Sequence, residues 1–154
     1  MKKQDIRIQN VTNVLVIGSG LALAWFKYFV KPVDEFSPVS SPWQVVSYNA
    51  HIITSPLLVL AIGMIWHNHI WSRWKNGTVR EFGKLKIHTG RILMFLIVPM
   101  IWSGYVLQTT ADETGRKILI PIHLITSGLW TVAFGLHLIA MKKMIKRKKP
   151  KKSQ

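Results

Sequence analysis

Long, uninterrupted runs of apolar residues dominate the hydropathy pattern of the chain. Four such runs cover residues 11–30, 44–70, 87–107 and 118–141, and the basic residues gather between and beyond them. Each run has about the ~20 residues that an α-helix needs to cross a ~30 Å hydrocarbon layer. Because the runs are continuous rather than alternating, they do not resemble the strands of a membrane barrel. The pattern therefore predicts an all-α membrane protein, a bundle of four transmembrane helices.

The 154-residue chain contains no Pro-, Gly- or Ser-rich linker, so we expect a single domain over residues 1–154. The first apolar run follows Lys2, Lys3 and Arg7, as in a signal peptide. It is too long for one, however, and lacks a small-residue cleavage site, so we expect a retained helix. Residues 142–154 are strongly basic, and they predict a solvated, disordered cytoplasmic tail.

The net charge of +15 is distributed unevenly about the apolar runs. If the runs are spans, 17 of the 21 Lys and Arg residues fall on one side and 4 on the other. The positive-inside rule then predicts that both termini lie in the cytoplasm and that the helices span the inner (cytoplasmic) membrane. Nucleic-acid binding is not expected, because it needs basic residues clustered on a folded surface rather than at the ends of apolar runs.

An internal repeat is visible in the sequence. The segments HIITSPLLVLAIG, from His51, and HLITSGLWTVAFG, from His123, carry the same residue at seven positions. The segments VIGSGLAL, from Val16, and MIWSGYVL, from Met100, share four, including a Ser-Gly pair. We therefore predict two repeated helical hairpins, related by a pseudo-twofold axis along the membrane normal.

The repeat places His51 and His123 at matching depth, facing each other near the outer side of the membrane. Thr and Ser follow each histidine on the same helical face, so short side chains leave space beside each imidazole. Gly20 and Gly104 lie toward the outer half of their helices, where a missing side chain lets a bulky, flat group approach the backbone. These features are those expected around a planar cofactor.

A second histidine follows His123 on the same predicted helix. His137 comes 14 residues later, which is ~40° short of four full turns and a rise of ~21 Å. Polar side chains inside a bilayer are costly and usually functional. The spacing suits two stacked haems, each held by neutral imidazole nitrogens. The chain contains no cysteine, which excludes disulfides, Cys-ligated iron–sulfur clusters and c-type haem.

The partner of the inner histidine is less simply placed. Continuing the repeat without gaps puts Ile65 opposite His137. We prefer His67 as the second inner ligand, although on an ideal helix it points ~160° away from His51. Pro56 could change the phase of that helix. The remaining candidates are His69 and His88.

Other site chemistries fit the sequence poorly. A zinc hydrolase needs three clustered ligands and an open position, whereas His67 and His69 are two residues apart, a poor helical spacing. The apolar runs contain no carboxylate for a proton relay or cation carrier. Neither a phosphate-binding Gly-rich loop nor a dinucleotide fingerprint is present.

With these features in view, the chain resembles the small dihaem cytochrome b proteins of membranes, over roughly residues 11–141. It is similar to the four-helix haem-binding core of the cytochrome b of quinol:cytochrome c oxidoreductases, and to the cytochrome b subunits of formate dehydrogenases and hydrogenases. The resemblance implies that His51 and His123 ligate an outer b-type haem, and that His137 ligates an inner one. The wider histidine spacing on the second helix departs from the family pattern.

We therefore expect a dihaem b-type cytochrome with four axial iron ligands, His51, His67, His123 and His137. It would carry electrons across the membrane between the quinone pool and a redox partner, as a subunit of a respiratory or electron-transfer complex. Its expected partners are membrane lipid, quinone or quinol, and other subunits that include a periplasmic redox protein. Two alternatives remain, namely a stand-alone quinol oxidoreductase with a small acceptor such as superoxide, and a haem-free membrane anchor or assembly protein.

Overall fold

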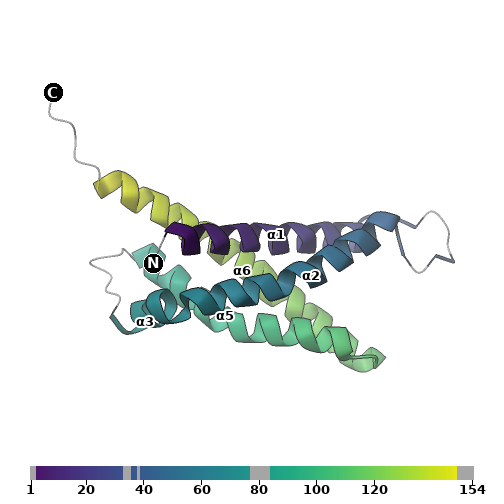
Figure 1. Ribbon diagram of the computed structural model, residues 1–154. Helices are drawn as coiled ribbons and strands as arrows, with labels where there is room; N and C mark the ends of the chain where they lie inside the picture. The colour runs from purple at the N-terminus through teal and green to yellow at the C-terminus, as the bar shows by residue number, and fades with distance from the viewer. Residues whose placement is uncertain (1–2, 33–35, 38, 77–83, 149–154) are drawn as a thin grey trace. The chain divides into compact units, whose positions relative to one another are not determined.

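Among the residues that the structure describes, every regular element is a helix. The computed structural model describes residues 3–32, 36–37, 39–76 and 84–148. The chain forms two compact units, Met1–His69 and Ile70–Gln154, which we call unit 1 and unit 2. Each contains a pair of long helices packed against each other (Figure 1).

Unit 1 pairs helix α1, Lys3–Tyr28, with helix α2, Pro42–Ile65. The start of α2 follows from local sequence. Ser41 is the N-cap, its hydroxyl accepting from the backbone N–H of Trp43 at 3.3 Å. Proline at the first helical position costs no hydrogen bond, because that N–H has no partner within a helix. The signal Ser-Pro thus fixes where the second helix begins.

The helical path continues beyond α2 in a different geometry. A π-helical turn, η1, covers Trp66–Trp71, and a short α-helix, α3, covers Ser72–Asn76. Helix α2 continues as an α-helix on both sides of Pro56. The departure from α-helical geometry therefore begins at Trp66 and not at the proline. Because a π-helix bonds from i to i+5, the ideal-helix rotation used above for His67 does not apply.

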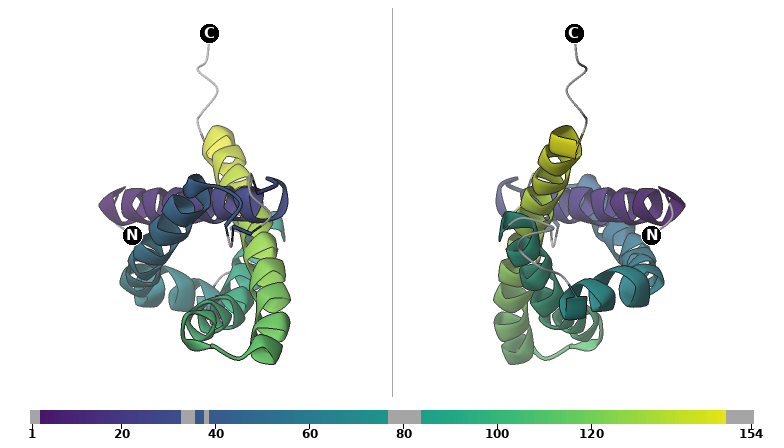
Figure 2. Two further views of the ribbon diagram at one scale, coloured as in Figure 1. Left: turned by 90° about the vertical axis from the view of Figure 1, so that its right-hand side faces the viewer. Right: turned by 90° about the vertical axis from the view of Figure 1, so that its left-hand side faces the viewer.

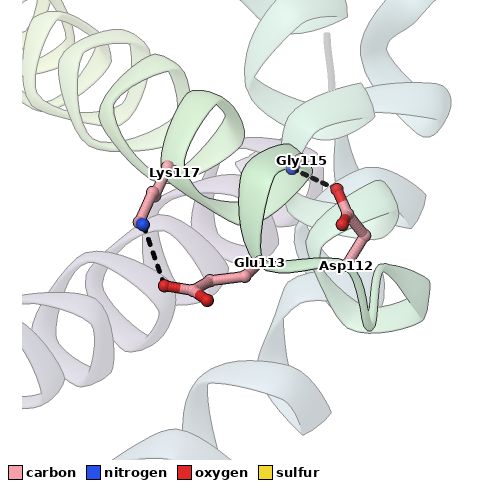
Figure 3. A network of polar contacts seen from close by, with 4 residues as sticks. All are labelled: Asp112, Glu113, Gly115 and Lys117. Atoms are coloured by element: carbon pink, nitrogen blue, oxygen red, sulfur yellow. Dashed lines mark hydrogen bonds and ion pairs between the residues drawn. The ribbon is translucent and has the colours of Figure 1, made fainter.

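Unit 2 pairs helix α5, Lys84–Thr109, with helix α6, Glu113–Lys148, and both views of Figure 2 draw the two helices side by side. Asp112 caps α6, because its Oδ2 accepts from the backbone N–H of Gly115 at 2.6 Å (Figure 3). Lys117 forms an exposed ion pair with Glu113 at 2.8 Å, one turn into the helix.

Four helical stretches are long and apolar enough to cross a membrane: Lys3–Tyr28, Pro42–Lys75, Lys84–Thr109 and Glu113–Lys142. The all-helical prediction is confirmed, and the four stretches suggest a multi-pass membrane protein.

The helices exceed the apolar runs that predicted them. The first begins at Lys3 rather than at residue 11, and α6 continues to Lys148. Residues 142–148, expected in a disordered tail, are therefore helical, while 149–154 lie outside the described residues. Lysine and arginine are good helix formers, so the end of an apolar run does not end a helix.

Candidate functional site

His51, on α2, is held by three residues of α1. Its Nδ1 lies 3.2 Å from the carbonyl oxygen of Val16 and 3.3 Å from the hydroxyl of Ser19. A Cβ atom added to Gly20 would lie 3.0 Å from the Cε1 atom of the imidazole. We call these four residues the His51 site. The imidazole is thereby tied to the neighbouring helix of its own hairpin.

His123, on α6, has the same surroundings in unit 2. Its Nδ1 lies 3.2 Å from the carbonyl oxygen of Met100 and 3.2 Å from the hydroxyl of Ser103. A Cβ atom on Gly104 would lie 3.0 Å from Cε1. These four residues form the His123 site, which uses the same ring nitrogen, the same hydroxyl-glycine pair and a carbonyl three residues before the hydroxyl.

A third site of this kind surrounds His137. Its Nδ1 lies 3.0 Å from the hydroxyl of Thr89, and the ring hydrogen-bonds the backbone of Lys86. A Cβ atom on Gly90 would be 3.5 Å from Cε1. These residues form the His137 site. Sequence reasoning had identified the histidine but not its Thr-Gly pair, which differs from the Ser-Gly pair of the repeat.

The hydrogen bonds identify the protonated nitrogen of each ring. The hydroxyl of Ser103 donates its one proton to its own helix, at 2.6 Å from the carbonyl of Pro99. It can therefore only accept from His123, as can the carbonyl of Met100. We assign the proton to Nδ1, which leaves Nε2 with the lone pair in a neutral imidazole. The same argument holds for the other two sites, where Ser19 donates to Val16 and Thr89 donates to Leu85.

The glycines explain how each ring approaches the neighbouring backbone. Carbon atoms in good contact are about 3.5–4.0 Å apart, so a methyl group at Gly20 or Gly104 would collide with the imidazole at 3.0 Å. Nε2 lies farther from these two positions, at 3.8 and 3.9 Å. The flat group beside each glycine is thus the Nδ1–Cε1 edge of an imidazole, and Nε2 lies on the farther edge.

The Thr-Ser pair after each repeated histidine bonds mainly to its own helix. Thr54 donates to the carbonyl of Ala50 at 2.7 Å, and its hydroxyl is also 3.4 Å from Ser19. Thr126 donates to the carbonyl of Ile122 at 2.8 Å. Folding back in this way keeps the side chains close to their helix, one turn from the histidine.

The two sites of unit 2 follow one register. The hydroxyl-glycine pairs that begin at Thr89 and Ser103 are 14 residues apart, as are His123 and His137. Fourteen residues make two heptads, so in a left-handed helix pair both sites lie on the same seam. The signal that would have revealed the Thr-Gly pair is therefore its distance from the Ser-Gly pair.

Unit 1 lacks the second site in both of its helices. Fourteen residues beyond His51 the chain has Ile65, which is 7% exposed. Fourteen residues before Ser19 and Gly20 it has Asp5 and Ile6. The break in the repeat noted at Ile65 thus extends to the facing helix, and the hydroxyl and the glycine are lost together with the histidine.

The remaining histidine candidates have other surroundings. His67 is exposed, and its Nδ1 lies 3.2 Å from the Oδ1 of Asn68 within η1. His69 is half-buried in the same turn, and His88 is exposed beside Thr89 on α5. Within the described residues, no group of three or more His, Cys, Asp or Glu side chains could hold a metal ion. Ligation by His67 stays a prediction.

No protein-family model, curated protein or solved structure matches the chain.

Proposed function

We propose that the chain is a b-type cytochrome of the inner membrane that carries electrons between quinone and a redox partner protein. The observation that supports this most directly is the recurrence of one imidazole environment at His51, His123 and His137. Histidines that ligate iron commonly donate the other ring N–H to a carbonyl or similar acceptor, which fixes the tautomer and orients the ring. At all three sites Nδ1 is the nitrogen that contacts the neighbouring helix, so Nε2 keeps its lone pair each time.

The chemistry of these residues fits a haem. With Nδ1 protonated, the atom that would bind the iron at each site is Nε2, a usual iron-binding atom of a neutral imidazole. The bound group would supply a one-electron carrier, and its potential would depend on the hydrogen bonds around the ligands. The chain's own contribution is to hold each ring in one tautomer and one orientation. Charged ligands are not required, which suits an apolar helical environment.

The proposal uses the two hairpins as repeats of one element. Val16, Ser19 and Gly20 hold His51 as Met100, Ser103 and Gly104 hold His123, so each hairpin would give one imidazole to the outer haem. The basic residues favour an orientation with both termini in the cytoplasm. The outer haem would then lie toward the periplasm, where a partner redox protein could exchange electrons with it.

His137 would hold the inner haem, with His67 as its first candidate partner and His69 and His88 as the others. The turn that carries His67 and His69 is π-helical, and such turns are frequent at functional sites. This is why we keep His67 in the proposal, although its Nδ1 contacts Asn68 rather than a neighbouring helix. Quinone would exchange electrons near the inner haem.

The absorbance spectrum of the purified chain, oxidised and then reduced with dithionite, tests the proposal. We expect a reducible b-type spectrum and two haems per chain. Replacing His51 or His123 with alanine should remove the same haem, and replacing His137 should remove the other. Exogenous imidazole should restore the lost haem in H123A, because a small ligand can fill the position that the side chain vacated. Absence of a reducible band in the intact chain would reject the cytochrome.

The inner partner can be found with the same spectrum. H67A, H69A and H88A are compared. The substitution that removes the second ligand of the inner haem should change the absorbance band of that haem alone. N68A is a matched control, since Asn68 lies in the same turn as His67 and contacts it without ligand chemistry. A change in N68A as large as that in H67A would indicate a disturbed turn rather than a lost ligand.

A haem-free membrane anchor is the second candidate. It is favoured by the bonding of each ring within its own hairpin, since hydrogen bonds between helices stabilise membrane proteins by ~0.6 kcal/mol on average. For this candidate, replacing His123 should lower stability without changing any absorbance band. The two candidates therefore differ in the spectrum and not in the folding assay.

A further inference from the structure

We propose that the surface formed by Trp71, Trp74, Lys75 and Arg91 binds the phosphate of an anionic phospholipid. We call these residues the aromatic-cation surface. They lie in unit 2, where the chain leaves η1, passes through α3 and enters α5. The inference does not depend on haem, and requires only that the helices enter a membrane.

Each cation of this surface lies over an indole ring. The Lys75 Nζ is 5.1 Å from the centroid of Trp71, and the guanidinium of Arg91 is 6.0 Å from that of Trp74. Both distances are within the ~6 Å range of a cation–π contact. The contact limits where each charge can lie without neutralising it, so both charges stay available to an anion.

The position of the surface suits lipid. The Trp74 ring meets Phe95 of α5 edge-on, with centroids 5.6 Å apart. Phe95 is 69% exposed, and Trp74 is 38% exposed. On passing from the acyl chains to the head groups of a membrane, apolar side chains give way to amphipathic indoles and then to cations. Phe95, Trp74 and Arg91 provide these three kinds of side chain at the end of a predicted span. The aromatic-cation surface would therefore lie at head-group depth.

Carboxylates of the described part of unit 2 lie at the opposite end of α5. They are Asp112, which caps α6, and Glu113, which pairs with Lys117. The end of α5 that carries Arg91 therefore has positive charge without a described carboxylate nearby. The phosphodiester of an anionic phospholipid fits this surface, because it accepts hydrogen bonds from lysine, arginine and indole N–H groups and carries a net negative charge. In phosphatidylcholine the choline ammonium cancels that charge.

The test measures lipid binding to the full-length chain in detergent micelles. Phosphatidylglycerol and phosphatidylcholine with the same acyl chains are titrated, and bound lipid is counted by native mass spectrometry. We expect tighter binding of phosphatidylglycerol. R91Q and K75Q should each weaken it by about fivefold, the value for one basic residue near an anionic surface, and should weaken binding of the zwitterionic phosphatidylcholine by less than about twofold.

Two matched variants separate a built site from a general positive potential. K84Q removes an exposed charge from the start of α5, and K27Q removes one that lies 5.6 Å from a tyrosine ring in unit 1. Each should change binding less than twofold. Equal affinity for the two lipids would overturn the proposal, as would a loss in K84Q equal to that in R91Q. Displacement of the lipid by inorganic phosphate would also overturn it. Helix content by circular dichroism confirms that each variant is folded.

Discussion

A methyl group at Gly104 should disturb the His123 site, whereas one at Gly90 should leave the His137 site almost unchanged. The two positions have the same role in the same helix pair, but the added Cβ would lie 3.0 Å from the imidazole at Gly104 and 3.5 Å at Gly90. The first distance is shorter than good carbon–carbon contact by about 0.5 Å or more, and the second is at its lower edge. In G104A the ring must move, and its Nδ1, now 3.2 Å from Met100 and from Ser103, moves with it.

The magnitude follows from two opposing effects. Alanine favours a helix over glycine by about 1 kcal/mol, and both variants gain this. Overpacking costs about 1–3 kcal/mol, and only G104A incurs it. We therefore expect G104A to be less stable than G90A by about 1–3 kcal/mol. G128A is the control for the helix effect alone, because nothing lies within 4 Å of its Cβ position.

The assay is denaturant unfolding of the purified chain in mixed micelles, followed by circular dichroism. G90A and G128A should unfold alike, at or above the wild-type midpoint, and G104A at a lower one. If G104A and G90A unfolded together, the close packing of His123 against Gly104 would not constrain the ring, and the reasoning would be refuted. For the proposed cytochrome, G104A should also shift or remove the outer haem band, while G90A should not.

Three smaller predictions concern single hydrogen bonds. S103A should lower the free energy of unfolding by ~0.6–1.7 kcal/mol, because it removes the hydroxyl that accepts from His123. S127A is the control, since the Ser127 hydroxyl donates to its own helix at 3.3 Å, and its free energy of unfolding should change by less than half as much. D112A should destabilise by about 1 kcal/mol through loss of the α6 cap, seen as a lower midpoint and contradicted by an unchanged one. E113Q should change the free energy of unfolding by less than about 0.5 kcal/mol, because the ion pair of Glu113 with Lys117 is exposed.

Much of the helical architecture could be predicted from residues near each other in sequence. The lengths of the apolar runs identified four stretches able to cross a membrane. The apolar runs placed the second and fourth helices from residues 44 and 118, whereas the structure begins them at Pro42 and Glu113, after the caps Ser41 and Asp112. Such caps are local signals, because a cap acts within one turn. The π-helical turn from Trp66 could not be predicted in the same way, since the segment WHNHIW contains no glycine or proline to mark a change of geometry.

The sequence pointed to the histidines of the three sites but to only some of the residues around them. The repeat selected His51 and His123, and the 14-residue spacing selected His137. The repeat also drew attention to Gly20 and Gly104, but as openings for a flat cofactor, whereas the imidazole of the facing helix lies beside them. Thr89 and Gly90 were missed because their importance depends on the register of α5 against α6, which periodicity within one helix does not contain.

By itself, then, the sequence determined the number of apolar helices, the placing of charges at their ends and which histidines recur, because each of these is set by composition over about one span. Tertiary structure alone decided how each of the three histidines is oriented. Pairing of the helices sets a backbone carbonyl, a hydroxyl and a glycine against one edge of each imidazole. Those contacts join residues 20 to 48 positions apart. They assign the proton to Nδ1, a choice that exists only once the acceptors of one helix face the ring of another.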